Sequence, residues 1–325
     1  MEGDRLMKTV VIDSSYLVYK SHFAFQNNQL AVVKDKRKIL TSAIFGFLKE
    51  IIRLYSDYKY DFIIAAWDSP PYIKKQIYSK YKQNRKKIDI PDLSTEKTLI
   101  KAILYDLNIP CLAAKGYEGE EVASSIIEKV NGDTDLYTND EDCYALISPT
   151  TSLINTNYDK FARRSMLNLF TLESLKKKYK TTPKKFIQMK ILMGCKQSDN
   201  VPGVEGIGPS KSSELINKYD TVKGVFENID IIEKEKPAIA KKLIKAKQEG
   251  IINIARKLTK IEKPTNITLF KPEQNYSYKE ILQYLEAKTL LAGTNSIVLK
   301  SIKKRFNDRI ENFETKVKWD IEVLR

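Results

Sequence analysis

The sequence predicts an α/β fold in which a central, mostly parallel sheet is flanked by helices. Two short apolar runs, residues 9–12 and 62–67, have the length of buried strands, and they stop at Asp13 and Asp68. Between them, apolar side chains recur with helical spacing over residues 43–54. Strands that alternate with helices indicate a parallel sheet, whose ligands gather beyond the carboxyl ends of its strands. We therefore expect the side chains that follow these strands to form the functional site.

We predict that the whole chain divides into three parts. An α/β core is expected over residues 1–180, including short strands near 136–137 and 152–155 and a basic helical gateway at about residues 72–92. A helical subdomain is expected over residues 181–265. Residues 266–325 form a C-terminal extension without assignable chemistry, with helices predicted at 277–287 and 303–313 and an edge strand at 316–323.

The amino-acid composition limits the partners and the cellular compartment that we expect for this chain. The 325 residues include 56 Lys and Arg against 41 Asp and Glu, a net charge of +15, which predicts a polyanionic partner, nucleic acid first. A generally basic surface is the simpler interpretation. No apolar run approaches the roughly 20 residues that span a bilayer, and residues 1–13 lack the pattern of a signal peptide, so no membrane partner is expected. Cys111, Cys143 and Cys195 are too few and too scattered for a disulfide framework or a zinc site, which favours a reducing compartment, the cytoplasm, or the host cytoplasm for a viral protein.

Acidic residues gather in one stretch of this basic chain, residues 115–147. One cluster stands at the start of a predicted helix and another just after a predicted strand; the members are Glu118, Glu120 and Glu121, then Asp140, Glu141 and Asp142. A single cluster at a helix start would mean little, because the helix macrodipole favours acids there. Two clusters of mutually repelling carboxylates are typical of a site that binds hard divalent cations. The stretch is interpreted as half of a metal site.

A second stretch, residues 72–87, is basic and aromatic. Its cations are Lys74, Lys75, Lys80, Lys82, Arg85, Lys86 and Lys87, with Tyr78 and Tyr81 interleaved. Cations that neutralise phosphates and rings that stack on bases are the two ingredients of single-strand binding. Lys82 and Arg85 stand one helical turn apart and could reach the same phosphate. A solvated helix face is the alternative interpretation.

A glycine-rich turn is predicted between two helices. The first helix begins at Thr182 and Pro183 and ends at Gly194, and the second runs through residues 215–216. The turn over residues 201–209 carries Gly203, Gly206 and Gly208. Backbone N–H groups that are freed of side-chain bulk can approach a DNA phosphate. Such turns also serve as simple connectors.

Six sequence blocks, in order, resemble the 5′-nuclease superfamily, which includes the 5′–3′ exonuclease domain of bacterial DNA polymerase I, the flap endonucleases and bacteriophage relatives. The blocks are VVIDSSYLVYKSHFAF at 10–25, AAWDSPP at 65–71, YSKYKQNRKK at 78–87, GYEGEEVASSI at 116–126, YTNDEDCYALI at 137–147 and SDNVPGVEGIGPSK at 198–211. The resemblance covers roughly residues 8–265. It implies a PIN-like, resolvase-like core and a helix-three-turn-helix subdomain.

Residue roles follow from the resemblance by position. It places two divalent ions, Mg²⁺ or Mn²⁺, on Asp13, Asp68, Glu118, Glu120, Glu121, Asp140, Asp142 and Asp199. It makes Tyr81 a ring that stacks on a base, and Lys82 and Arg85 the cations that hold the scissile phosphate. It assigns DNA contacts to the glycine turn with Ser210 and Lys211, and a potassium ion to the carbonyls of that turn.

Two departures from the family pattern matter. The usual Glu-x-Asp-Asp block is Glu118-Gly119-Glu120-Glu121 here. The usual Gly-Asp-x-x-Asp-Asn block becomes residues 194–200, one residue longer and without its first Asp. We expect the second ion to bind weakly or through fewer protein ligands, so that activity needs more Mg²⁺ or prefers Mn²⁺. Alternatively, Lys196 partly replaces the charge of that ion.

The resemblance implies a hydrolase, a structure-specific 5′–3′ exonuclease or flap endonuclease that acts as a monomer in replication or repair. Its expected partner is DNA with a 5′ flap, a nick or a single-strand/duplex junction, together with replication proteins. A bacteriophage-type RNase H acting on RNA/DNA hybrids is a close alternative. A cleavage-deficient nucleic-acid-binding accessory protein is a second alternative. A small-substrate metallophosphatase would explain the acids but neither the basic gateway nor the glycine turn.

Overall fold

The chain forms two compact units in the computed structural model, which describes residues 8–28, 30–34, 36–85, 89–130, 132–159 and 164–316. Unit 1 comprises Met1–Pro70, Asp89–Asn139 and Lys263–Arg325, and unit 2 comprises Pro71–Ile88 and Asp140–Glu262. This division differs from the expected three parts. The C-terminal extension belongs to unit 1, and the basic segment near residues 72–88 belongs to unit 2.

Unit 1 is built on a sheet that includes the predicted strands at residues 9–12, 62–67 and 136–137. In the order β6-β1-β4-β5-β9, its strands are β6 (Asp133–Tyr137), β1 (Lys8–Asp13), β4 (Phe62–Trp67), β5 (Cys111–Ala113) and β9 (Thr268–Leu269). Strands β6, β1, β4 and β5 pair in parallel, and β9 pairs antiparallel with β5. All six residues of β4 are buried, as expected for a strand that is covered on both faces. The predicted α/β fold is confirmed. Outside this sheet, β2 (Ala31–Lys34) and β3 (Arg37–Leu40) form a separate antiparallel hairpin.

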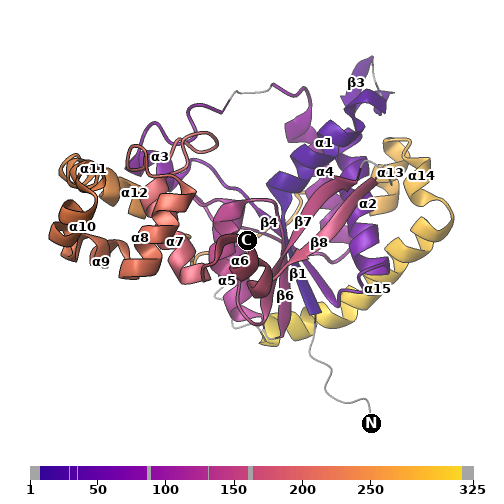
Figure 1. The fold of residues 1–325 in the computed structure, drawn as a ribbon. Helices are drawn as coiled ribbons and strands as arrows, with labels where there is room; N and C mark the ends of the chain where they lie inside the picture. Colours follow the sequence, from indigo (N-terminus) through magenta and orange to yellow (C-terminus); the bar gives the residue numbers. More distant parts are fainter. Residues whose placement is uncertain are drawn as a thin grey trace, which may run out of the picture. The chain divides into compact units, whose positions relative to one another are not determined.

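Helices complete unit 1: α1 (Ser14–Phe25), η1 (a 3₁₀ helix, Gln26–Asn28), α2 (Ser42–Ser56), α4 (Leu93–Asp106), α5 (Gly119–Lys129), α13 (Tyr278–Tyr284), α14 (Lys288–Leu291) and α15 (Gly293–Lys316). The predicted apolar stripe of α2 is buried. Figure 1 shows the C-terminal helices, in yellow, beside α2 and α4. Phe306 of α15 stacks on Phe62 of β4, with ring centroids 5.4 Å apart. The edge strand expected at residues 316–323 lies almost wholly outside the described residues, and Lys316 ends α15.

Unit 2 contains α3 (Ile73–Ile77), η2 (a 3₁₀ helix, Glu141–Leu146), an antiparallel pair of strands and a run of helices. The strands are β7 (Thr151–Asp159) and β8 (Arg164–Phe170). The helices are α6 (Leu172–Tyr179), α7 (Pro183–Met193), α8 (Pro209–Tyr219), α9 (Val222–Glu227), α10 (Ile229–Glu235), α11 (Pro237–Gln248) and α12 (Ile251–Thr259). Strand β8 is not among the strands predicted from the sequence. Its apolar pattern is weak because Leu169 stays half exposed.

The first helix beside the glycine turn begins and ends as predicted, and a second helix follows the turn. The Thr182 side chain accepts a hydrogen bond from the backbone N–H of Lys185, Pro183 opens α7, and Gly194 caps its end. The second helix, α8, begins at Pro209 and buries Leu215 and Ile216 in the apolar core of unit 2. Among the described helices, none combines the length and the apolar character that crossing a membrane requires.

A buried acid in unit 1 offers a test of the fold. Glu96 of α4 is fully buried, and its Oε2 accepts hydrogen bonds from the backbone N–H groups of Ala43 (2.8 Å) and Ile44 (3.2 Å), at the start of α2. We expect Glu96→Leu to lower the free energy of unfolding by roughly 1–3 kcal/mol, because buried N–H groups lose their acceptor. Glu96→Gln retains an acceptor oxygen and should lose less. Urea denaturation measures both, and equal losses in the two variants would contradict the acceptor role.

The pH dependence of the same site has a defined sign. Burial raises the pKa of Glu96 above its ordinary value, against the lowering effect of the two backbone hydrogen bonds. Its contribution to stability is therefore complete below the unfolded pKa of about 4.3 and declines as the pH rises through the folded pKa. We expect the wild type to lose stability relative to Glu96→Gln as the pH increases.

Candidate active site

Two carboxylates stand at one edge of the unit 1 sheet, as the sequence predicts. Asp13 ends β1 and caps α1: its Oδ1 accepts a hydrogen bond from Tyr16 N (3.0 Å) and its Oδ2 accepts one from Thr138 Oγ1 (3.1 Å). Asp68 follows β4, which pairs in parallel with β1. Its Oδ1 accepts a hydrogen bond from Gly119 N (2.7 Å), at the start of α5. The parallel register therefore brings the carboxyl ends of these strands to the same place.

Gly119 marks the point where the two carboxylates meet. A Cβ atom added there would lie 3.1 Å from Asp68 Oδ1 and 3.6 Å from Asp13 Oδ1. The helix α5 that starts at Gly119 carries the predicted acids of unit 1 in or next to its first turn. Both carboxylates thus face the positive end of a helix dipole.

The three glutamates around Gly119 differ in their local roles. Glu118 and Glu121 form a capping box, in which Glu121 Oε2 accepts a hydrogen bond from Glu118 N at 3.1 Å. Glu120 is buried in the first turn of α5. Two of the three predicted ligands therefore also cap their own helix, which is more specific than the general preference of a helix start for acids.

Unit 2 carries a second group of acids, Asp140, Asp142 and Asp199. Asp140 Oδ1 accepts a hydrogen bond from Asp142 N at 2.8 Å and so caps η2. Burial, with the nearby carboxylates of Asp142 and Asp199, raises the pKa of Asp140 to about 6, whereas the backbone hydrogen bond and Lys82 act in the opposite direction. The fold therefore holds ionised Asp140 at a cost that a nearby cation would reduce.

Lys190 is a buried cation of this group that sequence analysis missed. Its Nζ lies 2.5 Å from Asp142 Oδ1, and the two side chains are only 8% and 14% exposed. Burial by itself lowers the pKa of Lys190, but the Asp142 carboxylate more than offsets that effect and the pKa is raised. A lysine on the same side of α7 as the buried Phe186 and Met189 was the available signal. Lys196, the cation suspected from sequence, is exposed.

The loop over residues 195–200 holds the basic segment of unit 2 in place. Lys82 N donates a hydrogen bond to the carbonyl of Asp199 (2.8 Å), Arg85 Nε to that of Ser198 (3.1 Å), and Asn200 Nδ2 to that of Lys80 (2.8 Å). The Arg85 guanidinium also forms an ion pair with the buried carboxylate of Asp199. The loop that departs from the family pattern is therefore the one that positions Lys82 and Arg85.

The basic segment is not one continuous helix, which corrects the expected helical gateway. Helix α3 ends at Ile77, and Lys82 has a positive φ of 54°, the left-handed region that a helix does not use. Its N–H is bonded to another segment, as described above. Lys82 and Arg85 are therefore not part of a regular helix, although a hydrogen bond from Arg85 N to the carbonyl of Lys82 (3.3 Å) closes one turn between them.

Several predicted DNA contacts in this segment are buried or undescribed. Tyr81 is only 2% exposed and belongs to the apolar core of unit 2, so its ring is not presented to a base. Lys74 is also buried, with its Nζ 5.9 Å from the centroid of that ring, and Lys82 Nζ lies 5.1 Å from it. Lys75 and Lys80 are exposed, whereas Lys86 and Lys87 lie outside the described residues. The exposed lysines thus fit a phosphate-binding role and Tyr81 a packing role.

The glycines of the turn have different functions. A Cβ at Gly203 would lie 2.2 Å from the carbonyl oxygen of Met193, so this glycine is required for close packing on the end of α7 and is not free to meet a phosphate. Gly206 has a positive φ of 71°, and its carbonyl accepts a hydrogen bond from Lys211 Nζ at 3.1 Å. Gly208 is exposed and caps α8, with Ser210 and Lys211 exposed after it. The N-terminus of α8 is therefore the open part of the turn.

No preformed metal cage is present in the part of the chain that the structure describes. There, no three Asp, Glu, His or Cys side chains are grouped so that they could hold a metal ion. The carboxylates described above accept hydrogen bonds or pair with lysine and arginine. The ligand set inferred from the sequence therefore remains a prediction.

Two family models match consecutive parts of the chain, with their boundary at residues 180 and 181. The family described as "5′-3′ exonuclease, N-terminal resolvase-like domain" matches residues 8–180, and "5′-3′ exonuclease, C-terminal SAM fold" matches residues 181–283. A 5′-3′ exonuclease of Aquifex aeolicus is 31% identical over 303 residues, which are 90% of this chain and 96% of that protein. DNA polymerase I of Caldicellulosiruptor bescii is 29% identical over 299 residues, 88% of this chain but only 33% of that longer protein.

Solved structures share the fold at low sequence identity. The T5 5′-exonuclease with bound zinc ions has a TM-score of 0.54 at 17% identity, and the match covers 93% of this chain and 98% of that one. Human GEN1 in complex with Holliday junction DNA has a TM-score of 0.56 at 15% identity, over 94% of this chain and 73% of that one. Both matches extend over nearly the whole chain.

Two substitutions to serine separate the structural glycine from the open one. Gly203→Ser should lower the free energy of unfolding by about 1–3 kcal/mol, because its Cβ collides with the backbone at Met193. Gly208→Ser should be nearly neutral, since nothing lies within 4 Å of its added Cβ and serine is a good N-cap. Chemical denaturation of both variants gives the comparison, and equal losses would show that the packing of Gly203 does not matter.

Proposed function

Because the chain belongs to the 5′-3′ exonuclease family, we propose that it is a divalent-metal-dependent nuclease that hydrolyses DNA phosphodiesters near 5′ single-strand/duplex junctions. The observation that carries this proposal is the placement of Lys82 and Arg85 by the loop at residues 195–200, within the unit that also holds Asp140, Asp142 and Asp199. Fixed cations beside acids suit a phosphodiester, whose reaction develops negative charge on oxygen.

The carboxylates of unit 1 fit a hard divalent ion. Asp13 and Asp68 supply oxygen donors that meet at Gly119, the donor type that Mg²⁺ prefers. A divalent ion, when bound, lowers the pKa of the water molecule that it holds and acts as a Lewis acid toward the phosphate oxygen. We assign the holding of Mg²⁺ or Mn²⁺ to Asp13, Asp68, Glu118, Glu120 and Glu121 in unit 1, and to Asp140, Asp142 and Asp199 in unit 2.

The cations of unit 2 have a separate task in this proposal. Lys82 and Arg85 neutralise the scissile phosphate, and the hydrogen bonds between their segment and residues 198–200 keep them from rearranging as charge develops. Arg85 is about half exposed, which leaves part of its guanidinium open to a ligand. Lys75 and Lys80 extend the positive surface along the single strand.

DNA would be recognised by shape, without readout of its sequence. The exposed N-terminus of α8 with Gly208, Ser210 and Lys211 suits a duplex phosphate. A 5′ flap, a nick or a junction supplies both a duplex and a single strand, and RNA/DNA hybrids present similar phosphates. A potassium ion at the turn would compete with Lys211 for the Gly206 carbonyl. The free cysteines, of which Cys111 and Cys143 are buried, support action in the reducing cytoplasm.

Cleavage of a labelled 5′-flap duplex tests the proposed function. We expect metal-dependent product from the wild type, loss of cutting with retained binding for Asp140→Asn, and a turnover about 10²–10³-fold lower for Lys82→Ala. Lys184→Ala is the matched control, because Lys184 is an exposed lysine of the same unit to which no DNA contact is assigned. An RNA/DNA hybrid run in parallel separates a DNA nuclease from an RNase H. DNA that shifts but stays uncut in Mg²⁺ would identify a binding protein instead.

The number of metal ions that bind tests the prediction that the second ion binds weakly. Lys190 and Arg85 already pair with Asp142 and Asp199, and the first Asp of the family block is missing. We expect calorimetry without DNA to show one tight Mn²⁺ site, and Lys190→Met to strengthen a second site several-fold, because a competing cation is removed. Lys184→Met, at an exposed position of the same helix, is the control. Two tightly bound ions in the wild type would refute this expectation.

A further inference from the structure

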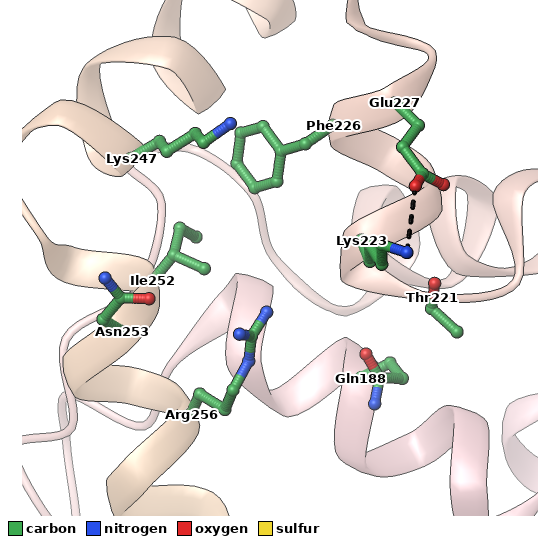
Figure 2. A pocket seen from close by; sticks show the side chains of 9 residues that line it. All are labelled: Gln188, Thr221, Lys223, Phe226, Glu227, Lys247, Ile252, Asn253 and Arg256. Atoms are coloured by element: carbon green, nitrogen blue, oxygen red, sulfur yellow. Dashed lines mark ion pairs between the residues drawn. The ribbon is translucent and has the colours of Figure 1, made fainter.

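Unit 2 contains a cavity of about 680 Å³ that has no part in the proposed nuclease site. Side chains from α7, α9, α11 and α12 line it, and Figure 2 shows it from close by. None of its lining residues belongs to the basic segment, to the loop at residues 195–200 or to the glycine turn. The volume lies within the roughly 300–1,000 Å³ that is typical of small-molecule sites.

The charge of the cavity favours an anion. Three cations line it, Lys223, Lys247 and Arg256, against one acid, Glu227. That acid is already engaged, since Glu227 Oε1 lies 3.2 Å from Lys223 Nζ one helical turn away. Within the described residues, neither Lys247 nor Arg256 has a carboxylate within 4 Å. Two cations therefore remain for a ligand.

An aromatic ring stands beside these cations. Phe226 packs partly against the apolar core of unit 2, and Lys247 Nζ lies 4.9 Å from the centroid of its ring. In Figure 2 the ring of Phe226 and the guanidinium of Arg256 point into the same space, with the Lys247 ammonium next to the ring. A planar heterocycle can stack on such a ring while its charged group reaches the cations.

We propose that this cavity binds a nucleoside phosphate, with the base against Phe226 and the phosphate between Arg256 and Lys247. A simple inorganic anion would leave the ring unused, and an apolar ligand would leave both cations unpaired. The same chemistry can come from a free mononucleotide or from a nucleotide within a bound strand. The second source rests on the proposed function, whereas the first does not.

Calorimetry in EDTA, where metal-dependent cleavage cannot occur, tests the proposal. The ligands are thymidine 5′-monophosphate, a 5′-phosphorylated oligothymidylate of four nucleotides, and inorganic phosphate. We expect the wild type to bind at least one of the two nucleotide ligands with a dissociation constant below about 1 mM. Arg256→Gln should weaken that binding at least about tenfold, because a phosphate loses a charge-assisted partner. Lys257→Gln, an exposed neighbour outside the cavity lining, should change it less than about twofold.

The ring is tested by two further variants. Phe226→Leu should weaken nucleotide binding and Phe226→Tyr should restore it, while thermal unfolding confirms that both variants fold. If the mononucleotide binds more tightly, the ligand of the cavity is a free nucleotide. If the oligonucleotide binds more tightly, the ligand is a nucleotide within a bound strand. Absence of nucleotide binding, equal losses in Arg256→Gln and Lys257→Gln, or inorganic phosphate binding as tightly as both nucleotides would overturn the proposal. Flap cleavage by Arg256→Gln is measured separately with metal. If this variant cuts DNA as the wild type does, the nuclease is intact, and a failure to bind nucleotide concerns the cavity alone.

Discussion

The backbone of Lys82 and the side chain of Arg85 are both anchored to one short loop, and the proposed chemistry depends on this anchor. Asp199 serves twice, because its carbonyl accepts the Lys82 N–H and its buried carboxylate pairs with Arg85. The left-handed backbone of Lys82 is unfavourable for a residue with a Cβ and persists only where its surroundings hold it. The loop at residues 195–200 is therefore the segment that sets the position of both residues.

A second feature of unit 2 is that positive side chains pair with its group of acids. Holding the partly buried Asp140 and Asp142 near the buried Asp199 is unfavourable unless positive charge accompanies them. The fold supplies that charge from its own chain, through Lys190 on α7 and Arg85 on the basic segment. In unit 1 the carboxylates of Asp13 and Asp68 accept hydrogen bonds from backbone and hydroxyl groups and lie at the start of α5. The positive charge of Lys97 also acts on Asp68.

Local patterns in the sequence predicted much of this arrangement. Apolar runs that end at Asp13 and Asp68 identified β1 and β4, and Thr182, Pro183 and Gly194 marked the ends of α7. These features depend on neighbours along the chain. The ion pair of Lys190 with Asp142 and the burial of Tyr81 depend on the packing of distant segments, so periodicity and spacing could not predict them. The assignment of residues 263–316 to unit 1 likewise depends on distant contacts such as that of Phe306 with Phe62.

The discontinuity of unit 1 has a consequence for synthesis on the ribosome. Both segments of unit 2 precede Lys263 in the sequence, so the core of this unit is complete before Lys263 is translated. Unit 1 must wait, because β5 acquires its neighbour β9 from residues 268–269, and Asp61 acquires its ion pair from Arg305. Contacts of such long sequence separation form slowly. The nascent chain therefore carries a finished helical unit while the sheet that holds Asp13 and Asp68 is still exposed, and this interval is when aggregation competes most with folding.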